Sequence, residues 1–206
     1  MDIIVRDYAP ADGPQLVEVF SDATPSLRAS NGGVHPDDEI DKLIGTPEPL
    51  MRERITKDAC AVVAVVRETG QVIGMNAFTN GFLDRLTNST YSKHMFVRDG
   101  FQHGKAGVSV GRLVREKLLQ KARSMGYRKI FGYSTPEAVG FHRKFGAVFY
   151  PEHNTTYCEG KVELHYYEIE LRKSFWNSIR FEPYLFKFFK FTTMLREVLG
   201  RSLRRS

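Results

Sequence analysis

Three glycines lie close together between a strand-like run and a helix-like run. The strand-like run ends at Val97, the glycines are Gly104, Gly107 and Gly111, and the helical pattern continues to Met125. Glycine lets the backbone approach a ligand closely, and the first amides of a helix have no partner within that helix. Because the helix dipole also favours negative charge there, this stretch predicts a site for an anion such as a diphosphate.

Two common phosphate-binding motifs are excluded. No Gly-Lys-Ser or Gly-Lys-Thr follows the glycines, as a P-loop would require. No acidic residue closes a second strand at the spacing that a ribose hydroxyl would need. A hairpin expected over 59–79 also argues against a doubly wound dinucleotide fold, in which helices separate nearly all strands.

Hydrophobic periodicity predicts the elements that would position the glycine turn. Strands are expected over 2–6, 59–67, 71–79, 90–98, 129–133, 147–150 and 162–171. Helices are expected over 11–20, 36–44, 49–55, 107–125 or 111–125, and 136–146, with loops over 22–34 and 81–89. A hairpin combined with strand–helix–strand crossovers predicts a mixed α/β fold with one sheet of six to seven strands.

Composition indicates a single cytoplasmic domain with an appendage. The chain has 206 residues, 42% of them hydrophobic, which is enough for a sizeable core. The two cysteines show neither a disulfide framework nor metal-ligand spacing, so a reducing compartment is expected. The N-terminus lacks the charged and apolar regions of a signal peptide, and no apolar run approaches the ~20 residues of a membrane span.

Charge is concentrated at the C-terminal end. Residues 172–206 hold nine Lys or Arg against two Glu, a net charge of +7. The whole chain has a net charge of +6, so residues 1–171 carry a net charge of −1. The expected organisation is therefore a near-neutral domain over 1–171 and a basic, aromatic-rich helical tail over 172–206. A near-neutral domain does not predict general affinity for nucleic acid.

Several motifs in one order resemble the Gcn5-related N-acetyltransferase (GNAT) superfamily, along about 2–171. Val5 and Arg6 with Asp12 look like its opening strand and first helix, and 59–79 resembles its second and third strands. Residues 97–102 are similar to the end of its fourth strand and the start of its pyrophosphate loop. Residues 138–147, Ala-Val-Gly-Phe-His-Arg-Lys-Phe-Gly-Ala, resemble its later motif.

The chain departs from the family pattern at two places. The loop motif Gln/Arg-x-x-Gly-x-Gly/Ala fits partly when it starts at Gln102 and partly when it ends at Gly111, and both registers stay open. His142 stands where the family usually has tyrosine.

The resemblance implies an acyl-CoA N-acyltransferase fold with a mostly antiparallel sheet flanked by helices. It implies acetyl-CoA, or a longer acyl-CoA, as acyl donor, and no metal. The donor would lie in a gap between the strands expected over 90–98 and 129–133. The residues expected to bind it are Met95, Phe96, Val97, Gln102, His103, Gly104, Lys105, Ala106, Gly107, Val108, Ser109, Gly111, Arg112, Phe141 and Lys144.

The implied reaction is attack of a primary amine on the thioester, which requires a base and a proton donor for the leaving thiolate. His142 is the first candidate donor, because histidine titrates near neutral pH, and Tyr133 is the alternative. His94 is the candidate base. Tyr91, on the opposite strand face, could hold a water instead, and the sequence leaves both open.

The acceptor and the tail define what the protein would contact. The expected acceptor is the amine of a small molecule, such as a cell-envelope or sugar precursor, and the alternative to an enzyme is a non-catalytic acyl-CoA-binding or membrane-associated adaptor. The tail could pack on the domain or form a homodimer. It could instead lie on the inner face of an anionic membrane as an amphipathic helix. Nucleic acid is the least favoured partner.

Overall fold

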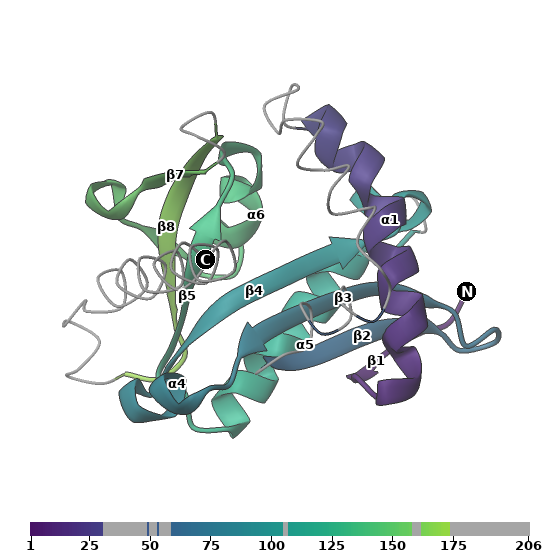
Figure 1. The fold of residues 1–206 in the computed structure, drawn as a ribbon, viewed down its shortest axis with the longest axis horizontal. Helices are drawn as coiled ribbons and strands as arrows, with labels where there is room; N and C mark the ends of the chain where they lie inside the picture. Colours follow the sequence, from purple (N-terminus) through teal and green to yellow (C-terminus); the bar gives the residue numbers. More distant parts are fainter. Residues whose placement is uncertain (31–48, 50–52, 54–58, 105–106, 158–161, 174–206) are drawn as a thin grey trace, which may run out of the picture. The chain divides into compact units, whose positions relative to one another are not determined.

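The computed structural model describes residues 1–30, 49, 53, 59–104, 107–157 and 162–173 (Figure 1). Eight strands form one sheet in the order β1-β2-β3-β4-β5-β8-β6, and β7 pairs with β8. The strands are β1 (Ile3–Asp7), β2 (Ala59–Val66), β3 (Val72–Thr79), β4 (Ser89–Val97), β5 (Lys129–Ser134), β6 (Val148–Phe149), β7 (Thr155–Tyr157) and β8 (Val162–Glu170). The helices are α1 (Gly13–Ser30), α4 (Phe82–Thr87), α5 (Val110–Ser124) and α6 (Val139–Arg143).

The sheet is mostly antiparallel, as expected. Every strand pair is antiparallel except β4 with β5, which is parallel because α5 connects the two strands. The mixed α/β fold class is therefore confirmed. All seven expected strands are present, and the eighth is the three-residue β7, which is too short to show a hydrophobic pattern.

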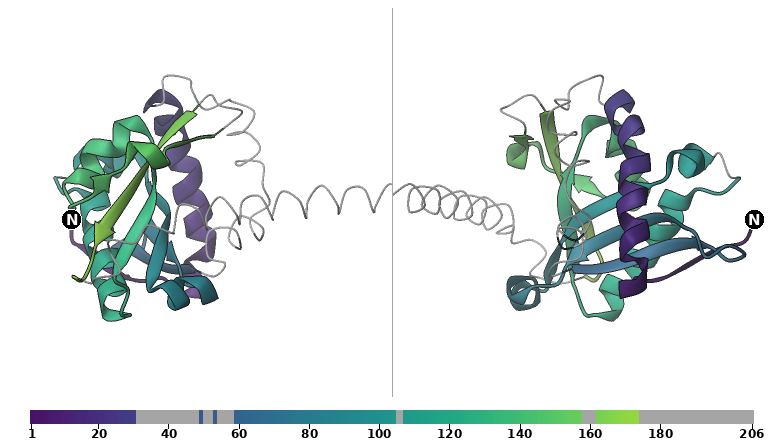
Figure 2. Two further views of the ribbon diagram at one scale, coloured as in Figure 1. Left: turned by 90° about the vertical axis from the view of Figure 1, so that its left-hand side faces the viewer. Right: turned by 45° about the vertical axis from the view of Figure 1, so that its right-hand side comes forward.

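Helices cover both faces of the sheet. One core cluster joins the strand residues Val62, Ala64, Ile73 and Phe78 to Val110, Val114, Leu118 and Ala122 of α5. The other joins Ala61, Val63, Val65 and Met75 to Leu16, Val19 and Phe20 of α1. Alternate residues of β2 thus face α5 and α1, as strand geometry requires. Figure 1 shows α1 in front of β2–β4 and α5 behind them, and Figure 2 shows α1 along its face of the sheet from two further sides.

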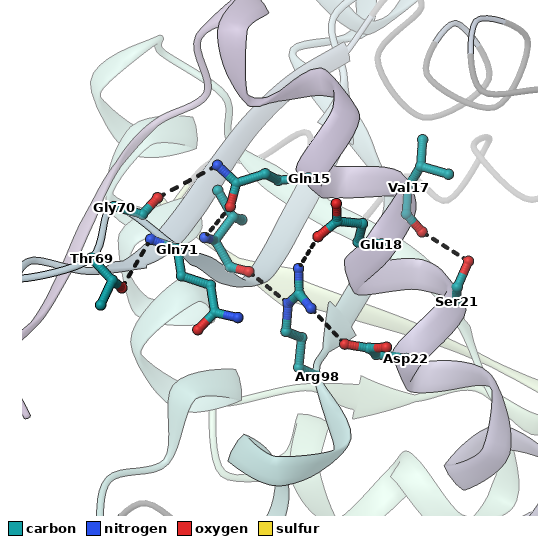
Figure 3. Close-up of polar contacts among 10 residues, drawn as sticks. Gln15, Val17, Glu18, Ser21, Asp22, Thr69, Gly70, Gln71 and Arg98 are labelled. Carbon is teal, nitrogen blue, oxygen red and sulfur yellow. Dashed lines mark hydrogen bonds and ion pairs between the residues drawn. The ribbon is translucent and has the colours of Figure 1, made fainter.

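Helix α1 is longer than the sequence predicts. It was expected to end near residue 20, with a turn-rich loop beginning at Asp22, but it continues to Ser30. Asp22 and Glu18 lie one turn apart on α1 and both accept hydrogen bonds from Arg98, at 2.6 and 2.7 Å (Figure 3). This contact with the end of β4 is long-range, so local propensity could not reveal it.

The segment expected as a loop over 81–89 contains α4. Asp84 accepts hydrogen bonds from the Gly81 amide at 2.7 Å and the Thr79 hydroxyl at 2.6 Å. These bonds satisfy the helix N-terminus, and Asn88 ends the helix with a positive φ of 49°. Asp84 is therefore a structural cap.

Several expectations lie outside the described residues. The helix expected over 36–44 is among them, and within the one expected over 49–55 only Pro49 and Glu53 are described, both helical. The tail beyond residue 173, with the amphipathic helix expected in it, also lies outside the described residues. Within the described part of the chain, no helix is both long and apolar enough to cross a membrane.

Candidate active site

Strands β4 and β5 separate soon after they begin to pair. Their register covers three residue pairs, Ser89 with Lys129, Thr90 with Ile130 and Tyr91 with Phe131. Beyond Tyr91, β4 continues to Val97 while β5 continues to Ser134, and Figure 1 shows the two strands diverging. We call the facing edges, residues 92–97 of β4 and 132–134 of β5, the fork. The sequence expectation of a splay at this point is met.

A β-bulge marks β4 at the start of the fork. Ala77 of β3 pairs with His94, but the next residue, Phe78, pairs with Ser92, so Lys93 is the additional residue. Bulges turn a strand and redirect its side chains, and they are frequent beside active sites. No sequence pattern indicates this bulge, because a bulge is defined by the pairing with the neighbouring strand.

The three β4 residues expected to contact an acyl donor lie along the fork. Met95 and Val97 pack against the α5 side of the sheet, whereas Phe96 packs against the α1 side. The Val97 carbonyl accepts a hydrogen bond from the Gln102 side chain at 2.8 Å. Gln102 therefore supports the end of β4, immediately before the glycine turn.

The glycine turn requires glycine at two positions. Gly104 and Gly107 both have φ near 75°, a conformation that other residues rarely adopt. The Gly107 amide donates to the Gly104 carbonyl at 2.8 Å, which closes the turn. Lys105, Ala106 and the side chain of His103 lie outside the described residues.

Helix α5 begins directly after this turn. Its first intrahelical bond runs from the Leu113 amide to the Ser109 carbonyl at 3.1 Å, so the amides of residues 110–112 precede the hydrogen-bonded ladder. Gly107, Val108 and Ser109 are exposed. The turn can thus present backbone donors and the positive helix end to an anion.

The remaining expected donor-binding side chains differ in their surroundings. Arg112 is paired with Glu116 on the same helix at 2.8 Å, and this hydrogen bond raises the pKa of Arg112. A Cβ at Gly111 would meet the Phe141 ring at 3.8 Å, so α5 and α6 lie in contact there. Lys144 is exposed at the end of α6.

His142 is buried on the face of the sheet that carries α5. Its imidazole stacks on the Tyr167 ring with centroids 4.3 Å apart, and its Nδ1 has no hydrogen-bond partner among the residues that the structure describes. Burial, and secondarily the charge of Arg115, lower the pKa of His142 to about 3. The ring is therefore neutral at pH 7, which counts against proton donation by an imidazolium.

The other two expected catalytic residues lie on the opposite face. Tyr133 packs edge-on against Tyr166 at 5.4 Å, and burial raises the pKa of Tyr133 to about 12. Tyr166 and Tyr167 are neighbours on β8 and point to opposite faces, so Tyr133 and His142 are separated by the sheet. His94 stacks with Phe96 on the α1 side. The structure therefore does not bring the three candidates together.

One buried residue of this region, Arg115, is not predicted by the sequence. Arg115 of α5 is 0% exposed and donates hydrogen bonds to the Ser92 hydroxyl at 2.9 Å and to the Tyr167 hydroxyl at 3.2 Å. Ser92 lies on β4 and Tyr167 on β8, which pairs with β5, so one side chain connects β4 to the strand beyond β5. The available signal was that Arg115 falls on the apolar stripe of α5, between Val114 and Leu118.

The fork and the turn together suit one kind of ligand. Backbone donors and a helix end can hold an anionic group, and diverging strand edges can pair with an extended chain. Among the described residues, no group of three His, Cys, Asp or Glu could hold a metal ion.

No family model matches the chain, and no curated protein matches it by sequence. Solved structures match by shape. A GNAT superfamily phosphinothricin acetyltransferase from Sinorhizobium meliloti in complex with AcCoA has a TM-score of 0.62 at 16% identity, over 85% of this chain and 91% of that one. The ribosomal-protein-S18-alanine N-acetyltransferase from Escherichia coli has a TM-score of 0.59 at 9% identity, over 84% of this chain and 96% of that one.

A third structure, the PaiA N-acetyltransferase from Thermoplasma acidophilum in complex with coenzyme A, has a TM-score of 0.55 at 17% identity. It covers 82% of this chain and 99% of that one. At such identities the likeness concerns the fold alone. This chain has the GNAT N-acetyltransferase fold.

Proposed function

We propose that this protein transfers an acetyl group, or a longer acyl group, from coenzyme A to a primary amine. The observation that carries this proposal is the fork, where β4 and β5 part after three residue pairs, beside the glycine turn that opens α5. An acyl-CoA has a diphosphate at one end of an extended amide-containing arm and a thioester at the other. Such a molecule matches an anion site that leads into two strand edges.

The residues present fit the diphosphate end. Gly104 and Gly107 hold a turn that other residues would strain, and the exposed segment 107–109 leads into the first amides of α5. In this proposal these amides bind the diphosphate, and Arg112 adds charge once it exchanges Glu116 for a phosphate. Met95, Phe96 and Val97 offer the edge of β4 to the arm.

The chemistry requires the amine to reach the thioester without its proton. In this proposal His94, or a water held by Tyr91, accepts that proton on the α1 side of the sheet. The bulge at Lys93 lies next to His94 and sets the direction in which this part of β4 faces. In this proposal the proton donor to the leaving thiolate lies on the other face of the sheet, which carries α5 and the buried His142, and Tyr133 is the alternative donor.

A non-catalytic acyl-CoA-binding protein is the second candidate. One observation favours it: His142 stands in place of the family's tyrosine, and the lowered pKa leaves it neutral at pH 7. Both candidates require acyl-CoA binding, but only the enzyme releases free coenzyme A thiol in the presence of an amine.

Thermal unfolding with acetyl-CoA tests the binding shared by both candidates. A ligand at 100 times its Kd stabilises the native state by ~2.7 kcal/mol, so the wild type should melt at a clearly higher temperature. Gly107→Ala should lose most of this shift. Gly70→Ala is the matched control, since Gly70 also has a positive φ of 70° and an open surrounding but lies in the β2–β3 turn.

The outcomes separate the candidates. No shift for the wild type at high acetyl-CoA would refute both. A shift without thiol release across a panel of small primary amines, including amino sugars, would support the non-catalytic acyl-CoA-binding protein and refute the enzyme. A shift with amine-dependent thiol release would establish the enzyme and give its acceptor class.

We further propose that the basic tail, residues 172–206, holds the enzyme at an anionic membrane surface, where a lipid-linked or cell-envelope amine would be met. Its nine cations and eight aromatic residues support this. Co-sedimentation with anionic vesicles should be lost when residues 173–206 are removed. Equal sedimentation of both proteins would refute the membrane role.

A further inference from the structure

Among the described residues, Arg115 is a fully buried cation with no carboxylate partner. Two of its nitrogens donate to the hydroxyls of Ser92 and Tyr167, and its Nε has no hydrogen-bond partner in the part of the chain that the structure describes. Removing a charge from water is expensive unless it is paired, so the fold retains this guanidinium against its own stability.

The Tyr167 hydroxyl lies at the point where the fork opens. A Cβ at Gly132 would come within 2.9 Å of this oxygen and 3.2 Å of the Ser92 Cβ. Gly132 and Ser92 each follow directly after the last β4–β5 pair, Tyr91 with Phe131. The absence of a side chain at Gly132 therefore makes room for the hydroxyl between the two strands.

Two neighbours fix Tyr167 in this position. Arg115 donates to its oxygen, with the guanidinium carbon 5.8 Å from the ring centroid. His142 stacks on the ring at 4.3 Å. A guanidinium that donates to the Tyr167 oxygen can stabilise negative charge that develops there.

We propose, on the basis of the acyl transfer proposed above, that the Tyr167 hydroxyl donates the proton taken up by the coenzyme A sulfur as the acyl group leaves. Arg115 and His142 are positioning residues that hold Tyr167, and Arg115 also stabilises negative charge at the fork. His142 thus supports the donor from the position where the family usually has a tyrosine.

The step balances without any further reagent. The amine nitrogen forms a bond to the thioester carbon, the carbon–sulfur bond breaks, and the sulfur keeps the electron pair and takes the Tyr167 proton. The proton lost by the amine nitrogen returns to the Tyr167 oxygen through water. The net result is an amide, a free thiol and an unchanged tyrosine.

The first test removes only the hydroxyl. Tyr167→Phe should lower kcat for acetyl transfer by ~100-fold, as expected for loss of a general acid, with the KM for acetyl-CoA little changed. Tyr166→Phe is the matched control: this neighbour is equally buried, and its hydroxyl donates to Glu168 at 2.9 Å on the opposite face. The control should keep kcat within ~3-fold of the wild type.

The second test needs no turnover. Coenzyme A and desulfo-coenzyme A, which lacks the thiol, are titrated calorimetrically into the wild type and Arg115→Met from pH 7 to 9. The wild type should prefer coenzyme A increasingly as pH rises, because Arg115 favours the thiolate, whose ordinary thiol pKa is near 8.5. Arg115→Met should lose that preference yet melt, without ligand, no lower than the wild type.

The outcomes distinguish this inference from the proposed function. If the wild type transfers acyl groups and Tyr167→Phe does so at the wild-type rate, the donor role is overturned and the function stands. If Arg115→Met keeps the pH-dependent preference, or melts far below the wild type, Arg115 is structural and its assigned role fails. If the wild type neither binds coenzyme A nor transfers, both proposals fall.

Discussion

The imidazole of His142 lies on the ring of Tyr167, with ring centroids 4.3 Å apart and an interplanar angle of 26°. This stack joins α6 to β8 on the face of the sheet that carries α5. It places an uncharged imidazole, a phenol and the guanidinium of Arg115 in one buried group, with Arg115 in turn contributing to the lowered pKa of His142. The stability and the chemistry of this region are therefore coupled.

His142 should make the protein sensitive to acid. Its pKa is about 3 in the folded chain, against 6.5 ordinarily, so only the unfolded state takes up this proton between those values. Stability should therefore fall as pH falls through that window, by roughly 1 kcal/mol per pH unit below about 5.5. Denaturant unfolding of the wild type and His142→Phe from pH 7 to 4 measures the difference, since phenylalanine keeps the stack but cannot titrate. Parallel curves for the two proteins would contradict this.

Asp12 should contribute stability that disappears in acid. Arg6 donates to both oxygens of Asp12 at 2.7 Å, and this hydrogen bonding lowers the pKa of the carboxyl, which also caps the Ala9 amide at 2.8 Å. The stabilisation is present above the unfolded value near 3.8 and is lost as pH falls through the folded pKa. Asp12→Asn should lose ~1–3 kcal/mol of unfolding free energy at pH 7 and less below pH ~3.5.

The control for this prediction is Asp2→Asn. Asp2 pairs with Arg67 on the surface, with more than half of each side chain exposed. An exposed pair contributes ~0–1 kcal/mol, so this variant should unfold nearly as the wild type does. A loss at Asp12 that is no larger, or that persists unchanged at pH 3, would contradict the assignment.

Arg98 should hold α1 on the sheet. Its side chain is 12% exposed and donates to Glu18, Asp22 and the Val72 carbonyl at 2.6–2.8 Å (Figure 3). Arg98→Leu should destabilise the protein by ~2–4 kcal/mol and speed amide exchange in α1, because two carboxylates lose a shared cation. Arg98→Lys should recover only part, since one ammonium cannot reach all three acceptors.

The comparison for Arg98 is Arg112→Leu, which removes an exposed pair with Glu116 within α5. Pairs of this kind contribute ~0.3–0.5 kcal/mol. Chemical denaturation of the variants ranks them. If Arg98→Leu and Arg112→Leu lose equal stability, the contact between β4 and α1 is not what extends the helix.

Gly132→Ala should strain the fork. The new methyl would lie 2.9 Å from the Tyr167 oxygen, and overpacking of this kind costs ~1–3 kcal/mol. Gly140→Ala is the control, because a Cβ there meets nothing within 4 Å and alanine favours the helix, so stability should stay level or rise. Equal melting temperatures for both variants would show that Tyr167 can move aside freely.

Sequence patterns predicted the strands well, because β2 and β3 are almost continuous apolar runs bounded by a turn. The predicted boundaries were wrong at α1 and α4. Asp22 has low helix propensity, and its contact with Arg98, 76 residues away, is beyond the reach of local periodicity. In α4, Gly81 and Asp84 are three residues apart, a capping spacing that the periodicity of apolar residues does not reveal.

The site was predicted as a region rather than as a set of contacts. The glycine turn and the strand before it stand out in the sequence because glycine and periodicity are local signals. That His142 and Tyr133 lie on opposite faces depends on the register of β5 against β8, which pairs Tyr133 with Tyr166. Arg115 was missed because an arginine in an amphipathic helix is normally assigned to its solvent face.

The buried charge of Arg115, which has no carboxylate partner among the described residues, has a consequence for how the sequence can diverge. Under selection for folding alone, many apolar replacements at this position would be accepted, and a long lineage would lose the arginine, after which Gly132 could acquire a side chain. A laboratory population selected for expression would therefore lose Arg115 and Gly132, whereas one selected for activity would keep both residues. A lineage that keeps both Arg115 and Gly132 has been selected for the activity at the fork and not for folding alone.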